Sequence, residues 1–190
     1  MEGKNKTRTH KSSSYSDNVL YNRSLLTRSV CIPMKNVNKN IHGEIERHIN
    51  KNYEGKCVVE GYIRPQSVKI ISYSSGLIKA DNIIFDVGFE CEVCYPIEGM
   101  KFKCLVNNIT KAGLRCEIPN ERPSPLVIFV TRDHNYMKDG FTDINEGDII
   151  NVKIIGQRFE LNDKYISVIA QLVESKKKTV TKKKPRLVIQ

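Results

Sequence analysis

The chain has 190 residues, of which 39% are hydrophobic and 27% are charged. This length suits one ordinary domain or two small ones and is too short for a multidomain enzyme. Lys and Arg number 31 against 21 Asp and Glu, which gives a formal net charge of +10. Most of this excess lies at the ends, because residues 1–19 carry +2, residues 174–190 carry +6, and the rest of the chain carries only +2. The ends are therefore suited to loose attraction to nucleic acid or another polyanion.

Membrane and secretory segments are not expected. No stretch approaches the roughly 18 apolar residues of a membrane span, and the first residues are not followed by an apolar region that would make a signal peptide. We expect a soluble, intracellular protein with no membrane partner, whose six cysteines remain thiols. Residues 1–18 and 174–190 are predicted to be disordered tails because they have almost no apolar side chains to bury.

The first half of the folded part, residues 19–96, predicts an α+β domain. Apolar residues at every fourth position from Val37 to Ile49 predict an amphipathic helix, with Asn38 as its N-cap and Gly55 as its stop. The last strand of this half alternates cleanly between apolar and acidic residues, so the helix should lie on an antiparallel sheet. The expected strands cover residues 29–34, 56–63, 68–73 and 82–95.

The second half, residues 97–173, predicts strands alone. Apolar and polar residues alternate on both sides of a turn at 110–113, and a long polar connection, 132–147, precedes the fourth strand. Five short strands with such a connection are what an all-β OB-fold barrel requires, and we favour it over an open sheet. The expected strands cover residues 101–106, 114–118, 126–130, 149–159 and 165–173.

Cys91-Glu92-Val93-Cys94 is the pattern closest to a metal or redox motif. With Cys104 and Cys116 it could supply four thiolates to zinc. Positions 91 and 94 differ by three in a strand of period two, however, so their sulfurs should leave opposite faces of the sheet. We interpret the cysteines as buried apolar thiols and predict no metal and no cofactor, with zinc binding and redox chemistry as the alternatives. Changing Cys94 to Ser would cost less than about 1 kcal/mol if its face is solvated.

Catalytic motifs do not support an enzyme. The chain has no Gly-x-Ser-x-Gly, no phosphate-cradling glycine loop and no His-Glu-x-x-His. His134 lies in a loop that could line a site, and such a lone histidine is more often a surface polar residue than a base. Glu90 and Glu92 are same-face strand neighbours and are most simply a solvated strand face. We predict no active site.

Basic side chains at outward or loop positions of the second half favour nucleic-acid binding as the function. They could form one basic groove for single-stranded nucleic acid, and ordinary solubilising charge is the alternative. The predicted RNA-binding residues are Lys101, Lys103, Lys111, Arg115, Arg132, His134, Lys153 and Arg158.

Aromatic platforms for stacked bases are scarce in the same half. Arg115 falls where a stacking residue would be useful and could stack through its guanidinium plane. The aromatic candidates are Phe129, Tyr136, Phe159 and Tyr165.

Several segments in chain order resemble one family. They are YEGKC at 53–57, SGLI at 75–78, FECEVCYPIEG at 89–99, TKAGL at 110–114 and EGDIINVKIIGQR at 146–158. In this order they resemble the stalk subunits of multisubunit DNA-directed RNA polymerases, the family of the seventh subunit of RNA polymerase II and its archaeal equivalent. The resemblance spans about residues 28–172. GYIRP at 61–65 departs from the commonest eukaryotic pattern, and both lysine-rich tails lie outside it.

The resemblance implies a non-catalytic subunit with an N-terminal tip domain that docks on the RNA polymerase core and an OB fold that meets nascent single-stranded RNA. It also implies a helical stalk partner related to the fourth subunit. Arg115 stands where that family often has an aromatic residue, which favours phosphate attraction over stacking. The tails and the abundance of Lys, Asn and Ile suggest a nucleocytoplasmic large DNA virus with its own polymerase. The protein would then act in the host cytoplasm or nucleus, or be packaged in the virion.

A free-standing OB-fold RNA-binding protein, such as a translation factor, is the alternative function. Such a protein would need no partner and should bind RNA as a monomer. The first half discriminates between the two, because a free barrel does not need an additional α+β domain with an almost uncharged strand at 68–71. That half makes better sense as a docking surface.

Overall fold

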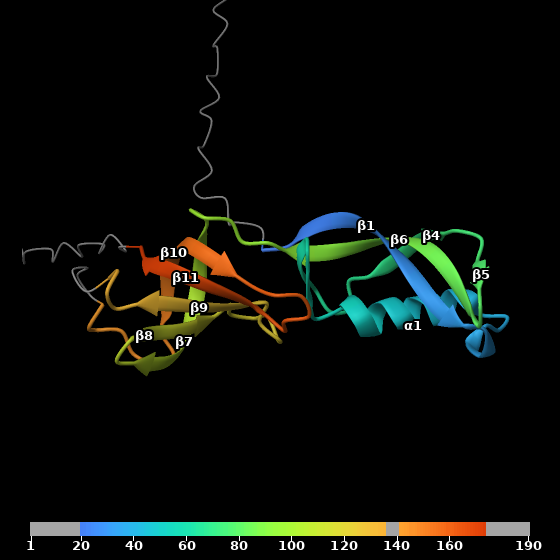
Figure 1. Cartoon of the computed structure of the whole chain (residues 1–190). Helices are drawn as coiled ribbons and strands as arrows, with labels where there is room; N and C mark the ends of the chain where they lie inside the picture. The colour runs from blue at the N-terminus through green and yellow to red at the C-terminus, as the bar shows by residue number, and fades with distance from the viewer. Residues whose placement is uncertain (1–19, 136–140, 174–190) are drawn as a thin grey trace, which may run out of the picture.

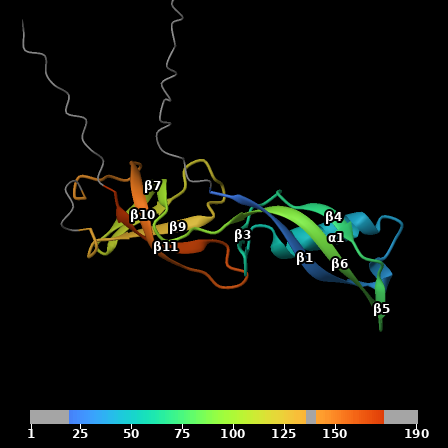
Figure 2. The same cartoon turned by 90° about the horizontal axis from the view of Figure 1, so that it is seen from above.

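The protein consists of two β structures placed end to end, a sheet that carries one helix and a closed barrel (Figures 1 and 2). The computed structural model describes residues 20–135 and 141–173. The predicted disordered tails and Tyr136 lie outside these residues. Within the described part, the helix is too short and too polar to cross a membrane.

The helix-bearing sheet is built around one long strand. One edge of β6 pairs with the whole of β1, and β5, β4 and β3 pair in turn with its other edge, all antiparallel. The helix α1 (Ile41–Tyr53) packs on this sheet through the fully buried Ile45 and Ile49, as its apolar periodicity predicts. The strands are β1 (Asn22–Pro33), β2 (Cys57–Val58), β3 (Gly61–Ile63), β4 (Lys69–Tyr73), β5 (Leu77–Lys79) and β6 (Asn82–Cys94), with a short 3-10 turn at Met34–Asn36.

The helix begins later than its sequence pattern predicts. Asn40, and not Asn38, is the N-cap, because its side-chain oxygen accepts a hydrogen bond from the backbone N–H of Gly43 at 3.2 Å. Asn38 acts one step earlier and accepts from the backbone N–H of Asn40 at 2.8 Å. The end of the helix is as predicted, since Gly55 follows it with φ of +68°.

Two strand predictions in this half need correction. Residues 56–63 form not one strand but the hairpin of β2 and β3, because the chain turns at Val59 and Glu60. β1 begins at Asn22, well before the predicted residue 29, since its first half gains its strand conformation from pairing with β6. β5 was not predicted at all; it is three residues long and too short for a readable alternation.

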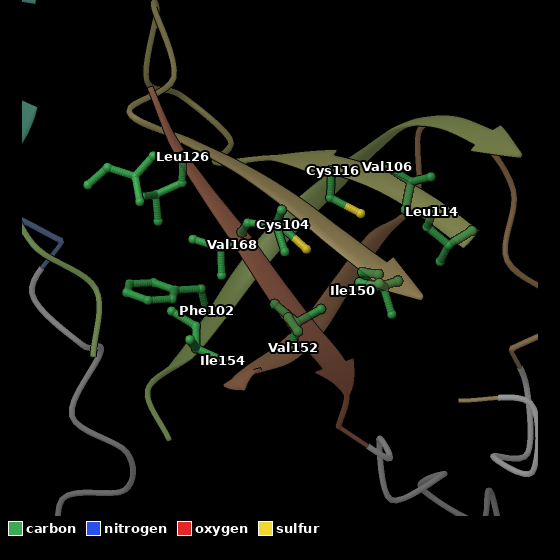
Figure 3. Close-up of a cluster of buried hydrophobic side chains, with 14 of the residues drawn as sticks. Phe102, Cys104, Val106, Leu114, Cys116, Leu126, Ile150, Val152, Ile154 and Val168 are labelled. Carbon is green, nitrogen blue, oxygen red and sulfur yellow. The ribbon is translucent and has the colours of Figure 1, made fainter. Parts of the chain in front are cut away.

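The second half forms a closed five-stranded barrel in the order β10-β11-β9-β8-β7, which confirms the predicted OB-like barrel. All neighbours are antiparallel except β9 and β11, which are parallel. Alternate residues point inward and fill the barrel, among them Phe102, Cys104 and Val152 (Figure 3). The strands are β7 (Lys101–Thr110), β8 (Gly113–Glu117), β9 (Leu126–Thr131), β10 (Ile149–Arg158) and β11 (Ile166–Leu172).

The sheet and the barrel meet at a buried junction. Cys57, Tyr62 and Cys94 belong to the sheet, yet they are buried in the same apolar cluster as the barrel interior. The backbone of Cys57 also accepts a hydrogen bond from the N–H of Asn162 at 2.9 Å and donates one to the carbonyl of Asp163 at 2.8 Å. The two β structures are therefore joined by both packing and backbone hydrogen bonds.

This junction corrects the assumption that the Cys94 face is solvated. Cys94 is buried because the barrel covers that face of β6. A serine hydroxyl placed there would have to be moved from water into an apolar cluster. We therefore expect Cys94→Ser to lower the free energy of unfolding by about 1–3 kcal/mol. Cys31→Ser, at an exposed position, is the control; equal urea denaturation curves for the two variants would contradict the buried junction.

Candidate nucleic-acid interface

The predicted basic residues fall into separate groups on the barrel. Lys101, Lys103 and Lys153 lie together, since Lys153 is directly opposite Lys101 in the register of β10 and β7, and Asn151 is opposite Lys103. We call these three residues the lysine row. They come together because outward positions on neighbouring strands share one side of the barrel wall.

A second group lies where the β7–β8 turn meets the end of β9. The backbone N–H of Arg132 donates to the carbonyl of Ala112 at 2.9 Å, which places the exposed Arg132 and His134 beside the turn that carries Lys111. The segment that follows β9 is held in place by Asn135, which is buried and whose side chain accepts a hydrogen bond from the backbone N–H of Leu172 at 2.7 Å. His134 is thus an exposed loop residue and makes none of the described hydrogen bonds.

Arg158 and Arg115 stand apart from both groups. Arg158, at the end of β10, is exposed and forms an ion pair with Glu160 at 3.1 Å. Arg115 projects outward from β8, opposite Phe129 of β9 in the strand register. The eight residues are thus carried by β7, β8, β10 and the segments at the β7–β8 turn and the end of β9.

Arg115 lines an open surface hollow of about 500 Å³. The hollow extends over β7, β8 and the start of β9, the loop 118–125 between β8 and β9, and the residues that lead into β11. It adds to Arg115 two cations that the alternation pattern did not single out, Arg122 and Lys164, together with the aromatic candidate Tyr165. Its lining residues are Leu105, Asn107, Arg115, Glu117, Ile118, Pro119, Asn120, Glu121, Arg122, Pro123, Ser124, Val127, Lys164 and Tyr165.

The carboxylates of this hollow are already matched by guanidinium groups. Glu117 lies 4.0 Å from Arg115, and Glu121 lies 3.2 Å from Arg64, which reaches over from the helix-bearing sheet. Within the described residues, Arg122 and Lys164 form no ion pair, so their charges are available to an anionic ligand. Both ion pairs are partly exposed, and each contributes little to stability.

The aromatic candidates differ in their accessibility. Phe129 and Tyr165 expose much of their rings on the barrel surface. Phe159 is half-buried and meets the ring of Tyr95 edge to face, with the ring centroids 6.1 Å apart. Tyr165 is the aromatic residue of the hollow, so the surface offers cations and a ring in one place.

The two acidic residues of β6 form ion pairs on its outward side. Glu90 lies 2.9 Å from Arg23, and Glu92 lies 2.7 Å from Arg64. With Ser67 and Lys69 these residues line a second hollow, on the helix-bearing sheet. Because the carboxylates are held apart by different arginines, they are a charged strand face and not a close carboxylate pair.

The cysteines of the possible zinc set are distributed over different cores. Cys91 is buried in the core of the sheet and Cys94 in the junction cluster, so their sulfurs do leave opposite faces of β6. Cys104 and Cys116 lie inside the barrel (Figure 3). Burial raises the pKa of Cys91 to about 11 and that of Cys94 to about 12. Among residues 20–135 and 141–173, no three His, Cys, Asp or Glu side chains are grouped as metal ligands.

Thiol labelling tests this arrangement. In the native protein at pH 8 we expect one cysteine, the exposed Cys31, to react rapidly with Ellman's reagent, and all six to react after unfolding. The other five are buried and inert, because a thiolate is needed for the reaction and burial disfavours it. Rapid reaction of several thiols, or one zinc ion per chain in elemental analysis, would contradict the assignment of apolar thiols.

Comparison with known proteins now places the chain in a family. No protein-family model matches it. A curated protein of Acanthamoeba polyphaga mimivirus, named "Putative DNA-directed RNA polymerase subunit L376", is 30% identical over 146 residues, which cover 70% of this chain and 73% of the mimivirus protein. This chain, with its helix-bearing sheet and OB-like barrel, therefore belongs to this family of DNA-directed RNA polymerase subunits.

Proposed function

We propose that the protein is the non-catalytic stalk subunit of the RNA polymerase of a large DNA virus. Residues 19–96 form its tip domain, which docks on the polymerase core, and residues 97–173 form an OB domain that contacts nascent RNA. The proposal rests on two observations taken together. The chain belongs to a family of DNA-directed RNA polymerase subunits, and it is an elongated molecule in which a helix-bearing sheet is followed by a closed barrel. The subunit would act where that polymerase transcribes, in the host cytoplasm or nucleus, and could be packaged in the virion.

An apolar surface at the far end of the sheet supports docking. Leu77 and Ile78 of β5 are each 67% exposed, and β5 lies at the end of the molecule opposite the barrel (Figures 1 and 2). Large apolar side chains left exposed at one end of a molecule commonly mark a protein interface. Binding at this end would leave the barrel projecting away from the surface on which the protein docks.

A second apolar surface lies at the junction and would suit the helical stalk partner. Val59, in the turn between β2 and β3, and Leu161, in the loop between β10 and β11, are exposed. Their segments are neighbours, since Cys57 is hydrogen-bonded to Asn162 and Asp163. A partner that covers both would contact the sheet and the barrel at once.

Co-purification from the native source tests the stalk assignment. We expect a tagged chain to recover the large polymerase subunits together with one smaller helical partner. Ile78→Asp should reduce this recovery at least tenfold, because a charge at a buried interface is costly. Ile149→Asp, at a similarly exposed position on the barrel, is the matched control. A tagged chain recovered as a monomer without polymerase subunits would refute the assignment.

A further inference from the structure

We infer that the hollow beside β8 is a binding site for a nucleotide of single-stranded RNA, an inference that rests on the RNA contact in the proposed function. It assigns that contact to Arg122, Lys164 and Tyr165 together with Arg115, rather than to the lysine row. The four residues come from two stretches far apart in the sequence: Arg115 and Arg122 lie in β8 and the loop after it, and Lys164 and Tyr165 lie just before β11.

The shape of the hollow suits an unpaired nucleotide. Its volume of about 500 Å³ lies in the range of small-ligand sites, about 300–1,000 Å³. Its walls come from β7, β8, the start of β9, the loop 118–125 and the approach to β11, so it is an open depression on one side of the barrel. A base can enter it only when it is unstacked and unpaired, which selects single strands over duplexes.

The chemistry of the lining matches the parts of a nucleotide. Tyr165, 43% exposed, presents a ring on which any base can stack. Arg122 and Lys164 supply two cations for phosphates from two different loops, and Asn107 and Asn120 add amide groups that can hydrogen-bond a base edge. The lysine row offers charge alone, which attracts phosphates but does not hold a base.

The outer wall of the hollow is fixed before any ligand binds. Within the loop 118–125, the hydroxyl of Ser124 accepts from the backbone N–H of Ile118 at 3.2 Å and donates to the carbonyl of Leu126 at 2.7 Å. Glu121 is held from the other side by Arg64, whose guanidinium also binds Glu92 at 2.7 Å. A loop anchored to both the barrel and the sheet loses little conformational freedom on binding, which favours affinity.

Binding of a fluorescent oligouridine to the full chain tests the stacking role. Tyr165→Ala should weaken binding by about 5- to 150-fold, the loss that one stacked base represents. Tyr165→Phe keeps the ring and should bind as the wild type does. Tyr95→Ala is the matched control, because Tyr95 is 44% exposed and lies outside the hollow. Equal weakening by Tyr165→Phe and Tyr165→Ala would overturn the stacking assignment.

The salt dependence of the same binding tests the charge role. On a log–log plot of affinity against salt concentration, Arg122→Ala should make the slope shallower by about 0.7 if the side chain neutralises one phosphate. Arg47→Ala, at an exposed and ion-paired arginine of α1 outside the barrel and the hollow, should leave the slope unchanged. Both comparisons use the full chain, so the contribution of the lysine-rich ends is the same in every variant.

Crosslinking separates failure of this inference from failure of the proposed function. With 4-thiouridine in the oligonucleotide, we expect crosslinked peptides that contain the loop 118–125 or Tyr165. If the wild-type chain binds RNA but the crosslinks map only to the lysine row or the ends, and Arg122→Ala and Tyr165→Ala bind normally, the hollow is not the site and the RNA role survives. If the wild-type chain binds no RNA at low salt, the RNA contact in the proposed function fails as well.

Discussion

Replacing Tyr62 with alanine is expected to lower the free energy of unfolding by about 3–5 kcal/mol, the usual cost of removing a fully buried aromatic side chain. Tyr62 is completely buried and lies between Cys57 and Cys94 in the strand register, on the face of the sheet that the barrel covers. The cavity would therefore open at the junction itself. Neither core could fill it without moving the sheet relative to the barrel.

The matched variant Tyr62→Phe should not destabilise the protein. The hydroxyl of Tyr62 is buried and has no hydrogen-bond partner among the described residues, and burial also raises its pKa. Removing an unsatisfied buried hydroxyl relieves its desolvation cost, so equal or greater stability is expected. Urea denaturation measures both variants. A loss below about 1 kcal/mol for Tyr62→Ala would mean that the barrel does not pack on the sheet as described.

The junction links stability to the proposed function. A stalk subunit that docks at β5 and binds RNA on the barrel needs a fixed geometry between the two, and the packing of Tyr62 and the backbone hydrogen bonds of Cys57 provide it. We expect wild-type unfolding to be a single cooperative transition. Tyr62→Ala should separate it into two, because Tyr62 belongs to the apolar cluster that joins the sheet to the barrel.

The parts of the fold that were predicted from sequence depend on local periodicity. Alternation from Phe85 to Val93 gave the correct inward face of β6, and spacing from Ile41 to Ile49 gave the helix. The closed barrel was predictable because its strands alternate and its long connection precedes the fourth strand. Each of these signals is contained within a short window of the chain.

The features that were missed depend on contacts between distant segments. The alternation of β6 assigns Cys94 to a polar face, and only the arrival of the barrel, built from residues after 100, buries it. Short strands such as β5 are too brief to show a period, and they form because β6 offers a pairing edge. The sequence of β6 alone therefore cannot show that the face carrying Cys94 is buried as well.

The candidate site shows the same limit. Outward basic residues could be identified from alternation, but alternation does not say which of them are neighbours around a closed barrel. Arg122 and Lys164 lie in loops without a period, and the fold alone brings them beside Arg115. A cluster of Pro, Asn and Arg at 118–125 was the available signal, and it indicates a loop without indicating what the loop faces.

Replacing Gly113 with alanine is the second change with a large expected effect, a loss of about 3 kcal/mol or more in the free energy of unfolding. Gly113 closes the β7–β8 turn with φ of +149°, a backbone conformation that strains other residues by about 1–3 kcal/mol. An added Cβ would also clash with the backbone carbonyl oxygen of Val130. Since neither backbone can yield without breaking the pairing of β8 with β9, both costs apply together.

Two other glycines separate these costs. Gly147 also has a positive φ, of +92°, but a Cβ there meets nothing within 4 Å, so Gly147→Ala should show the backbone strain alone. Gly156 has neither a positive φ nor a close neighbour, and Gly156→Ala should be nearly neutral. We expect urea denaturation to rank the three variants in the order Gly113, Gly147, Gly156, from the largest loss to the smallest. Equal losses at Gly113 and Gly147 would show that the carbonyl of Val130 does not approach Gly113 and that the barrel is more open at this turn than the pairing of Gly113 with Thr131 implies.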